Sequence, residues 1–427
     1  MAVPFDGNPV IGVRSLTRDY LDVTCLLTIY EADDTNGVTN DTRRREGSTA
    51  ATDRGQSASA ENDPASENDS AERKRRSVLK RTAAGAVTGV GLLSGCLGLN
   101  PSETSGDQPA DETDTEGADD SGPKVGVYLG DEGALEPWES WFGRSVDYYS
   151  FNVPTSGWDK YLVENMPFER PIRSIASERE IAVTMKLFPP SETTLNAVAA
   201  GEHADRHRAF ARSLIDHGMA DATLRIGHEM NGRWAFDNAV NRSNEFVRAW
   251  RAVVRAMDAA DEAAFDYVWA PHIGRGHMDP TDAYPGDEWV DQIGLTIYDK
   301  SQQYYPAECG DACVREHREE NWNRLVNQDF GLSYWAEFAR DHEKSLAFPE
   351  YGVVAQNWNG AGGGDNPLFF ERFADWIASN DDLVAWHNVW CFVAGPHFVG
   401  PSQLYVSDQW EIHSEASETF KNLFGSE

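Results

Sequence analysis

Two glutamate residues, Glu229 and Glu350, stand at the ends of apolar runs and could act together. Glu229 lies in LRIGHEMNGRW, between an imidazole and a nearby amide, and Glu350 lies in FPEYG. Two carboxyl groups about 5–5.5 Å apart can hydrolyse a glycosidic bond with retention, one as acid/base and one as nucleophile. The pair predicts a retaining glycoside hydrolase that acts on a polysaccharide, and this chemistry needs no cofactor or metal.

Two other functions are weighed against this one. The segment HEMNG begins like a zinc-binding HExxH helix, but the second His would fall at position 232, which is Gly232. A non-catalytic, surface-tethered polysaccharide-binding protein is the remaining alternative. Such a protein has no need for a matched acid and nucleophile, so the two glutamates favour the enzyme.

The elements that must position these carboxylates are eight short apolar runs alternating with helical patterns. The runs are rich in Val, Ile, Tyr and Trp, as buried parallel strands are, and amphipathic stretches begin at residues 244 and 368. Eight such units in about 300 residues predict a (β/α)8 barrel, with its active site at the carboxyl ends of the strands. An open doubly wound sheet is the main rival, but YLGDEGALEPW after the first run is not a Gly-rich phosphate turn. The eight runs begin at residues 125, 146, 181, 222, 265, 290, 346 and 383.

Tryptophan usage limits the folded part of the chain. All 14 Trp lie between Trp138 and Trp410, so the barrel domain is expected at 123–427. Residues 1–72 are interpreted as a disordered region or as an extension from a start codon assigned too far upstream, because 43–72 have almost no apolar content. Residues 97–122 are acidic and rich in Ser, Thr and Gly, which predicts a flexible linker.

Residues 73–96 have the layout of an export signal. The paired arginines Arg75 and Arg76 precede an Ala/Gly-rich stretch too short to span a bilayer, and LSGC ends at Cys96. This pattern resembles a twin-arginine signal with a lipobox, in which Cys96 carries the lipid. The hypothesis is an extracellular lipoprotein held at the cell surface, with membrane contact through the lipid anchor only.

The charge and the cysteines set further expectations. The net charge is −33 and only eight of the 37 basic residues are Lys, which suggests an extreme halophile and argues against a nucleic-acid partner. We expect a monomer.

Of the five cysteines, Cys309 and Cys313 in CGDAC are either a small disulfide or two free thiols, and Cys391 is expected to be buried.

Three motifs resemble glycoside hydrolase family 26, whose best-known members are endo-β-1,4-mannanases and which includes β-1,3-xylanases and mixed-linkage glucanases. They are LRIGHEMNGRW, YPGDEWVDQIGLTIYD at 284–299, and FPEYG, and they occur in the family's order. The resemblance covers about 300 residues. The resemblance implies a (β/α)8 barrel and β-mannanase-like cleavage by two Glu. Other β-glycans, including the cell's own exopolysaccharide, are alternative substrates.

The resemblance also implies roles for individual residues. Glu229 would be the acid/base, with a raised pKa, and Glu350 the ionised nucleophile. His228 would hydrogen-bond near the acid/base, and Tyr298 would hydrogen-bond the nucleophile. Arg225 has the same strand parity as Glu229, so it either keeps a carboxylate charged or forms an ion pair of the barrel core.

The residues that line the sugar cleft in this family differ here in part. Trp234 is followed by Ala-Phe-Asp rather than by further aromatics, Thr296 replaces the usual Asp, and His272 replaces the usual Asn. Aromatic rings can stack on sugar faces, and Trp390, at the end of the eighth run, and Trp358, after Glu350, are the candidates. The alternative for any Trp is packing in the core; the further candidates are Trp138, Trp158 and Trp386.

Overall fold

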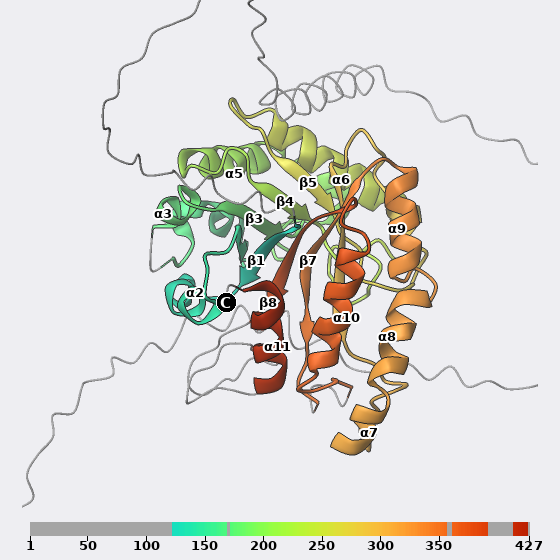
Figure 1. Ribbon diagram of the computed structural model, residues 1–427. Helices are drawn as coiled ribbons and strands as arrows, with labels where there is room; N and C mark the ends of the chain where they lie inside the picture. Colours follow the sequence, from blue (N-terminus) through green and yellow to red (C-terminus); the bar gives the residue numbers. More distant parts are fainter. Residues whose placement is uncertain (1–121, 169–170, 357–360, 392–412, 426–427) are drawn as a thin grey trace, which may run out of the picture.

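The chain folds into a closed barrel of eight parallel strands, in the order β1 to β8 (Figure 1). The computed structural model describes residues 122–168, 171–356, 361–391 and 413–425. Every predicted run contains a strand, so the predicted barrel is confirmed. The strands are β1 Lys124–Tyr128, β2 Tyr148–Asn152, β3 Glu180–Met185, β4 Thr223–Ile226, β5 Asp266–Trp269, β6 Gln292–Asp299, β7 Ser345–Val353 and β8 Val384–Trp390.

Helices surround this barrel, as Figure 1 shows for α5 and α6 on one side and α8 to α10 on another. The connection between β5 and β6 differs from the others, because it contains the 3₁₀ helix η5 Pro280–Ala283 and no α-helix. The α-helices are α2 Leu135–Phe142, α3 Ile172–Ala176, α4 Leu195–Ala199, α5 Ala204–Asp216, α6 Ser243–Asp258, α7 Asp311–Glu316, α8 Arg318–Asn327, α9 Leu332–Asp341, α10 Pro367–Ala378 and α11 Ser414–Phe424. The other 3₁₀ helices are η2 Glu132–Ala134, η3 Trp158–Tyr161 and η4 Val163–Asn165.

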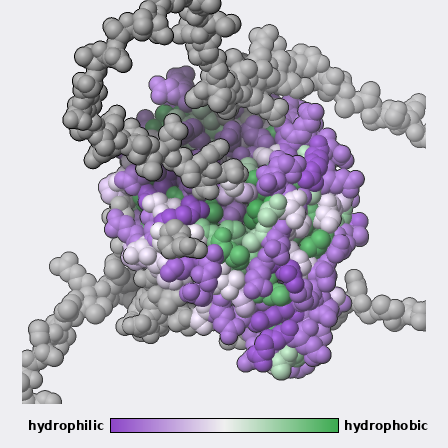
Figure 2. Space-filling model, in the orientation of Figure 1, coloured by the Kyte–Doolittle hydropathy of each residue, from purple (hydrophilic) through white to green (hydrophobic). Residues whose placement is uncertain are grey.

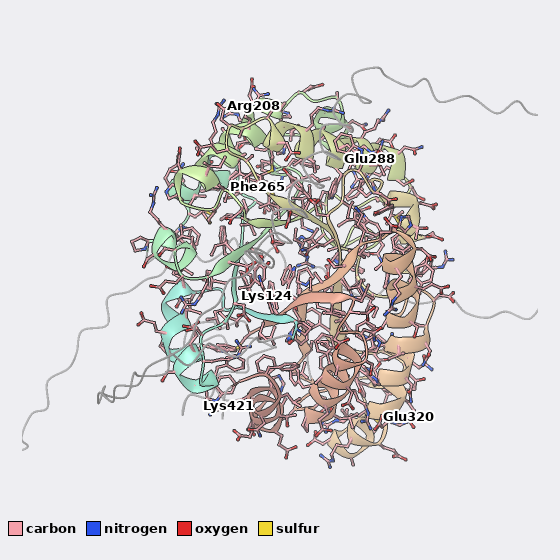
Figure 3. The ribbon with its side chains drawn as sticks, turned by 45° about the horizontal axis from the view of Figure 1, so that its top comes forward. Lys124, Arg208, Phe265, Glu288, Glu320 and Lys421 are labelled. Carbon is pink, nitrogen blue, oxygen red and sulfur yellow. A yellow bond between two sulfur atoms is a disulfide. The ribbon has the colours of Figure 1, made fainter. Side chains whose placement is uncertain are left out.

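The main core lies between the strands and the helices. Helix α6 shows how the sequence builds it, because Phe246, Trp250, Val253 and Met257 recur at helical spacing and are fully buried. Burial of each such side chain contributes about 1.5–3 kcal/mol. Figure 3 shows Arg208 of α5 and Glu320 of α8 at the periphery, whereas Lys124 at the start of β1 lies near the barrel centre.

A second, smaller core fills the barrel interior below the strand ends. Tyr148 and Trp386 stack there with ring centroids 4.8 Å apart, and Trp386 Nε1 donates to Gln292 Oε1 at 2.7 Å. Trp386 is therefore a packing residue, as are Trp138 and Trp158, which are buried in the main core. The rest of the inner cluster is small or aliphatic, which leaves room for the two large rings: Ala182, Val268, Ala270 and Ala347.

The outer surface agrees with the acidic composition. Figure 2 shows a face that is mostly hydrophilic, with smaller apolar areas between the helices. Among the described residues, no helix combines the length and apolar character needed to cross a bilayer. The predicted signal with Cys96, the linker and Trp358 lie outside the described residues.

Candidate active site

Glu229 is presented by a sharp turn where β4 ends. Gly227 and Glu229 both have left-handed backbone conformations, with φ of 56° and 57°. The Gly227 N–H still donates to Met185 O of β3 at 2.9 Å, whereas the Glu229 N–H donates across to Ala270 O at 2.8 Å. A positive φ is unfavourable for Glu, and such strain concentrates at functional sites. The turn places the Glu229 carboxyl at the carboxyl end of the barrel.

The loop after Glu229 supplies its hydrogen-bond donor. Trp234 Nε1 donates to Glu229 Oε2 at 2.6 Å, which fixes the carboxyl orientation. A Cβ at Gly232 would lie 2.2 Å from the Trp234 ring, so only glycine allows the indole to fold back onto this turn. Trp234, which the sequence predicted as a site residue, therefore contacts Glu229 directly.

Asn231 joins this loop to the loop after β5. Its Nδ2 donates to His272 O at 2.9 Å, and the His272 N–H donates to its Oδ1 at 2.9 Å. The rings of Trp234 and His272 meet edge to face, with centroids 5.3 Å apart. His272 is thus brought to the same side of the mouth as Glu229.

Glu350 reaches the barrel interior through an irregularity in β7. Gly294 of β6 pairs with Ala347, but Thr296 pairs with Glu350, so β7 has one extra residue between these pairs. Ala347 faces the inner cluster and Phe348 packs outside against Phe373 of α10. Strict alternation would turn Glu350 outward with Phe348, and the bulge turns it inward instead.

Two donors hold the Glu350 carboxylate once it points inward. Arg225 Nη1 donates to Glu350 Oε2 at 2.5 Å, and Tyr298 Oη donates to Oε1 at 2.8 Å. Arg225 is buried and its other terminal nitrogen donates to Thr296 Oγ1. Arg225 thus forms a buried ion pair with Glu350, and its charge lowers the pKa of that carboxyl. Thr296 carries no charge, so Glu350 is the acidic partner of this guanidinium.

Burial raises the pKa of Glu350 above its ordinary value, against the opposing charge of Arg225. The negative charge of Glu229 raises this pKa further, whereas the hydrogen bonds from Arg225 and Tyr298 lower it. Since each carboxylate opposes ionisation of the other, the two share one electrostatic environment.

Burial also raises the pKa of Glu229, but the charges of His272, Arg225 and Lys186 and the Trp234 hydrogen bond outweigh it and leave this pKa lowered. This order is the reverse of the one expected from the sequence. Burial lowers the pKa of His272 itself, against the opposing charge of Glu229. Arg225, which contacts Glu350 directly, lowers the pKa of both carboxyl groups.

The structure also describes the two remaining predicted residues, His228 and Trp390. His228 is buried behind Glu229, and burial together with the Lys186 and Arg225 charges lowers its pKa, so it is neutral. Its Nδ1 has no hydrogen-bond partner among the described residues. Trp390 lies half-buried at the end of β8, with its ring stacked on Tyr128 at 3.9 Å between centroids.

Sequence reasoning missed a buried pair behind the site, Lys186 and Asp237. Lys186 follows β3 and is 3% exposed, and Asp237 is fully buried. A lysine inside the apolar run IAVTMKLF was a signal that could have been used, because a buried lysine requires a partner. No pattern in the sequence indicated Asp237.

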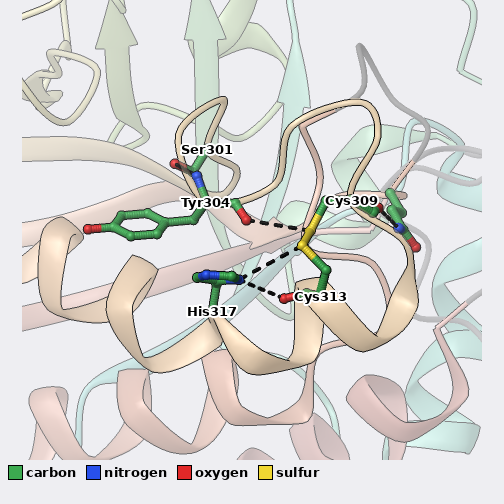
Figure 4. The surroundings of a disulfide bond; sticks show 6 residues. Ser301, Tyr304, Cys309, Cys313 and His317 are labelled. Atoms are coloured by element: carbon green, nitrogen blue, oxygen red, sulfur yellow. Dashed lines mark hydrogen bonds between the residues drawn. A yellow bond between two sulfur atoms is a disulfide. The ribbon is translucent and has the colours of Figure 1, made fainter.

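Cys309 and Cys313 form a disulfide, which resolves the two alternatives left by the sequence (Figure 4). His317 lies beside it, with Nδ1 3.9 Å from Cys313 Sγ. These three residues have metal-binding proximity, but the disulfide occupies both sulfurs. Gln356 Nε2 donates to Cys309 O at 2.6 Å, so the disulfide loop contacts the segment that follows the Glu350 strand.

Comparison with known proteins gives a consistent result. Residues 210–314, which include Glu229 and Tyr298, match the family model described as Glycosyl hydrolase family 26. A mannan endo-1,4-beta-mannosidase of Bifidobacterium adolescentis is 28% identical over 208 residues, or 47% of this chain. The match spans only 19% of that protein's length. These matches support a glycoside hydrolase related to family 26.

Solved structures with a similar fold include two mannanases. A modular endo-beta-1,4-mannanase from Cellulomonas fimi is 19% identical with a TM-score of 0.48, over 71% of this chain and 70% of that chain. A family 26 beta-mannanase from Bacteroides ovatus is 14% identical with a TM-score of 0.45, over 72% of this chain and 89% of that chain.

Proposed function

We propose that this chain is a retaining glycoside hydrolase that cleaves β-linked polysaccharide by double displacement, with Glu229 as acid/base and Glu350 as nucleophile. One observation carries the proposal. Glu350 is held by Arg225 and Tyr298 at the carboxyl end of the barrel, and Glu229, held by Trp234, is close enough to raise its pKa. Each carboxylate thus has its own donors.

In the first step, a Glu350 oxygen attacks the anomeric carbon while the bond from that carbon to the glycosidic oxygen breaks. Glu229 transfers its proton to the departing oxygen, which leaves as a hydroxyl. The product is a glycosyl ester on Glu350. Arg225 and Tyr298 orient the attacking carboxylate, since both donate to it before reaction.

In the second step, ionised Glu229 removes a proton from a water molecule. The water oxygen attacks the anomeric carbon from the face that the first sugar left, and the ester bond to Glu350 breaks. The two inversions retain the anomeric configuration. Glu229 ends protonated and Glu350 ends ionised, so the enzyme is regenerated.

We propose β-1,4-mannan, cleaved internally, as the substrate to test first. The relatives above are named as enzymes of mannan, and the matched segment contains the acid/base turn. Thr296 and His272 stand at two cleft positions that differ from the family's usual residues, so β-1,3-xylan and mixed-linkage glucan belong in the same panel.

The experiment measures reducing-sugar release from these polymers in molar salt, for the native protein and for Glu229→Gln and Glu350→Gln. Exposed Glu371→Gln on α10 is the matched control. We expect release from one polymer, a loss of about 10³-fold or more in both site variants, and no loss in the control. Proton NMR of the first product anomer should show retention.

Two results would contradict the proposal. Release that survives both substitutions would show that other residues carry the chemistry. Binding of a polymer without release from any member of the panel would favour a non-catalytic polysaccharide-binding protein. A 2-fluoro glycosyl fluoride should also label Glu350, and mass spectrometry of peptic peptides would detect a label at another residue.

We further propose export through the twin-arginine route and lipidation of Cys96, on the strength of RRSVLK and LSGC. Replacing Arg75 and Arg76 by Lys should leave the precursor in the cell, whereas Cys96→Ala should release the exported protein from the membrane fraction. An unchanged membrane fraction for Cys96→Ala would rule out this anchor.

A further inference from the structure

A buried lysine, Lys186, contacts the loop that carries Glu229 at two points. Lys186 Nζ donates to His228 O at 3.1 Å and forms an ion pair with Asp237 Oδ1 at 3.5 Å. His228 directly precedes Glu229, and Asp237 lies three residues beyond Trp234. One ammonium group therefore contacts the loop on both sides of the Glu229–Trp234 hydrogen bond.

Asp237 is fixed to the scaffold as well as to Lys186. Its Oδ2 accepts the backbone N–H of Leu187 at 2.9 Å, directly after Lys186 in the chain. Tyr161 Oη donates to Lys186 O at 3.0 Å, which holds the same peptide segment from the β2 side. The end of β3 is thus a rigid support for the loop after β4.

This pair is not explained by stability alone. Both side chains are at most 4% exposed, and removing two charges from water is expensive unless their attraction is strong. Apolar residues of similar size are often as stable in such places. A charge retained directly behind a reacting carboxyl group has a second effect, because it acts on that carboxyl through a poorly screening interior.

We propose that Lys186 and Asp237 form a positioning pair for the acid/base Glu229, holding its loop and setting its charge state, an inference that rests on the proposed hydrolase function. Lys186 lowers the pKa of Glu229, which is a smaller effect than burial and the His272 and Arg225 charges. It also helps keep His228 neutral, after burial.

Other groups face Glu229 and remain in every variant described below. Their charges act from β4, β6, β7 and the loop after β5, so the effect of Lys186 is measured as a difference on a constant background. These groups are Arg225, His272, Tyr298, Lys300 and Glu350.

The test is the charge-neutral double variant Lys186→Met/Asp237→Asn. Asn keeps an acceptor for the Leu187 N–H, and Met keeps the length of the lysine stem. The matched control is Arg179→Met/Glu139→Gln, because Glu139 pairs with Arg179 at 2.8 Å and accepts the Val146 N–H in the same manner. That pair is about a tenth exposed and joins α2 to the residue directly before β3, at the opposite end of the strands from Glu229.

We expect kcat of the Lys186/Asp237 double variant to fall by about 10- to 100-fold with little change in KM, because a misplaced catalytic group costs rate rather than binding. The alkaline limb of its pH profile should move to higher pH, since removing a nearby cation raises the Glu229 pKa. The Arg179/Glu139 control variant should change neither kcat nor the position of the alkaline limb. Lys186→Arg keeps the positive charge, so its alkaline limb should stay at the native position.

A folded double variant with native kcat and an unmoved alkaline limb would overturn the proposal. If the double variant does not fold, Asp237→Asn alone should lower kcat, and a native rate there would overturn it equally. The Glu229 pKa can also be followed by ¹³C NMR of labelled glutamate, assigned with Glu229→Gln. That measurement separates failure of this inference from failure of the hydrolase proposal, because it needs no substrate.

Discussion

At the scale of single residues, the two donors on Glu350 differ in kind. Arg225 contributes a fixed positive charge, whereas Tyr298 contributes a neutral hydroxyl whose own pKa is raised by burial and by Glu350. Removing Arg225 would leave the buried Glu350 without a counter-charge, which would affect folding and catalysis together. Tyr298 therefore offers the cleaner change.

Tyr298→Phe removes only the hydroxyl that donates to Glu350 Oε1. That hydrogen bond lowers the Glu350 pKa, so its loss raises the pKa. Because Glu350 must be ionised to attack, we expect the acid limb of kcat/KM to move to higher pH. A hydrogen bond to a charged group is worth about 1.5–3 kcal/mol, so kcat/KM should fall by about 10- to 100-fold. Rates measured from pH 4 to 9 would show both effects.

Tyr305→Phe is the matched control for this change. Tyr305 Oη donates to Asp299 Oδ1 at 3.1 Å, so the same group is removed from a buried carboxylate that neighbours Tyr298 in sequence but takes no part in the proposed reaction. The acid limb should stay in place in this variant. An equal shift in both variants would mean that general loosening, and not the bond to Glu350, moves the profile.

At the scale of elements, the sequence predicted the strands well because each is a compact run of buried β-branched and aromatic residues. The inward direction of Arg225 followed from alternation along β4, and the structure confirms it. Alternation fails in β7, where the extra residue between Ala347 and Glu350 reverses the side of the sheet. A bulge depends on pairing with β6, which the local pattern of apolar residues does not encode.

The contacts behind the site were also beyond local patterns. Lys186 and Asp237 are 51 positions apart in the chain and meet only because β3 and the loop after β4 are neighbours in the barrel. The resemblance implied a hydrogen bond of His228 near Glu229; in the structure the His228 ring is buried, and its Nδ1 has no hydrogen-bond partner among the described residues. The sequence thus predicted the partners of Glu350 and missed the buried pair of Lys186 and Asp237.

The disulfide at the start of α7 closes only a short loop, with a sequence separation of four. The entropy removed from the unfolded chain by so short a loop corresponds to about 2 kcal/mol. We therefore expect Cys309→Ser/Cys313→Ser to lower Tm by only about 4–8 °C, since 1 kcal/mol shifts a large domain by about 2–4 °C. Calorimetry with and without a thiol reductant would check this.

A native-like protein should remain after that change, and the reductant should have no effect on the double variant. Complete unfolding of the reduced protein at 37 °C would contradict the expectation. It would mean that the contact between Cys309 and Gln356 supports the β7 segment far more strongly than loop closure alone.

At the scale of the whole molecule, the barrel mouth and the outer surface differ in charge. The proposed catalytic pair, Glu229 and Glu350, lies near Arg225, Lys186 and Lys300, so the interior of the mouth contains cations. The chain as a whole carries −33, and the visible surface is mostly hydrophilic. Like charges on the outside repel one another and oppose the compact state, and this repulsion depends on ionic strength.

Salt should therefore stabilise the fold. Raising KCl from 0.1 M to 1 M shortens the screening length from about 10 Å to about 3 Å, which removes repulsion between neighbouring surface carboxylates. Relief of a few kcal/mol would raise Tm by about 5–10 °C. Buried pairs such as Arg225 with Glu350 are screened far less, so salt should act on stability more than on the intrinsic rate of a folded site. Thermal unfolding is measured in a KCl series and in a sucrose series of equal osmolality. Sucrose is excluded from the protein surface but screens no charge, so the comparison separates the two effects. If sucrose raises Tm as much as KCl does, surface repulsion is not the cause.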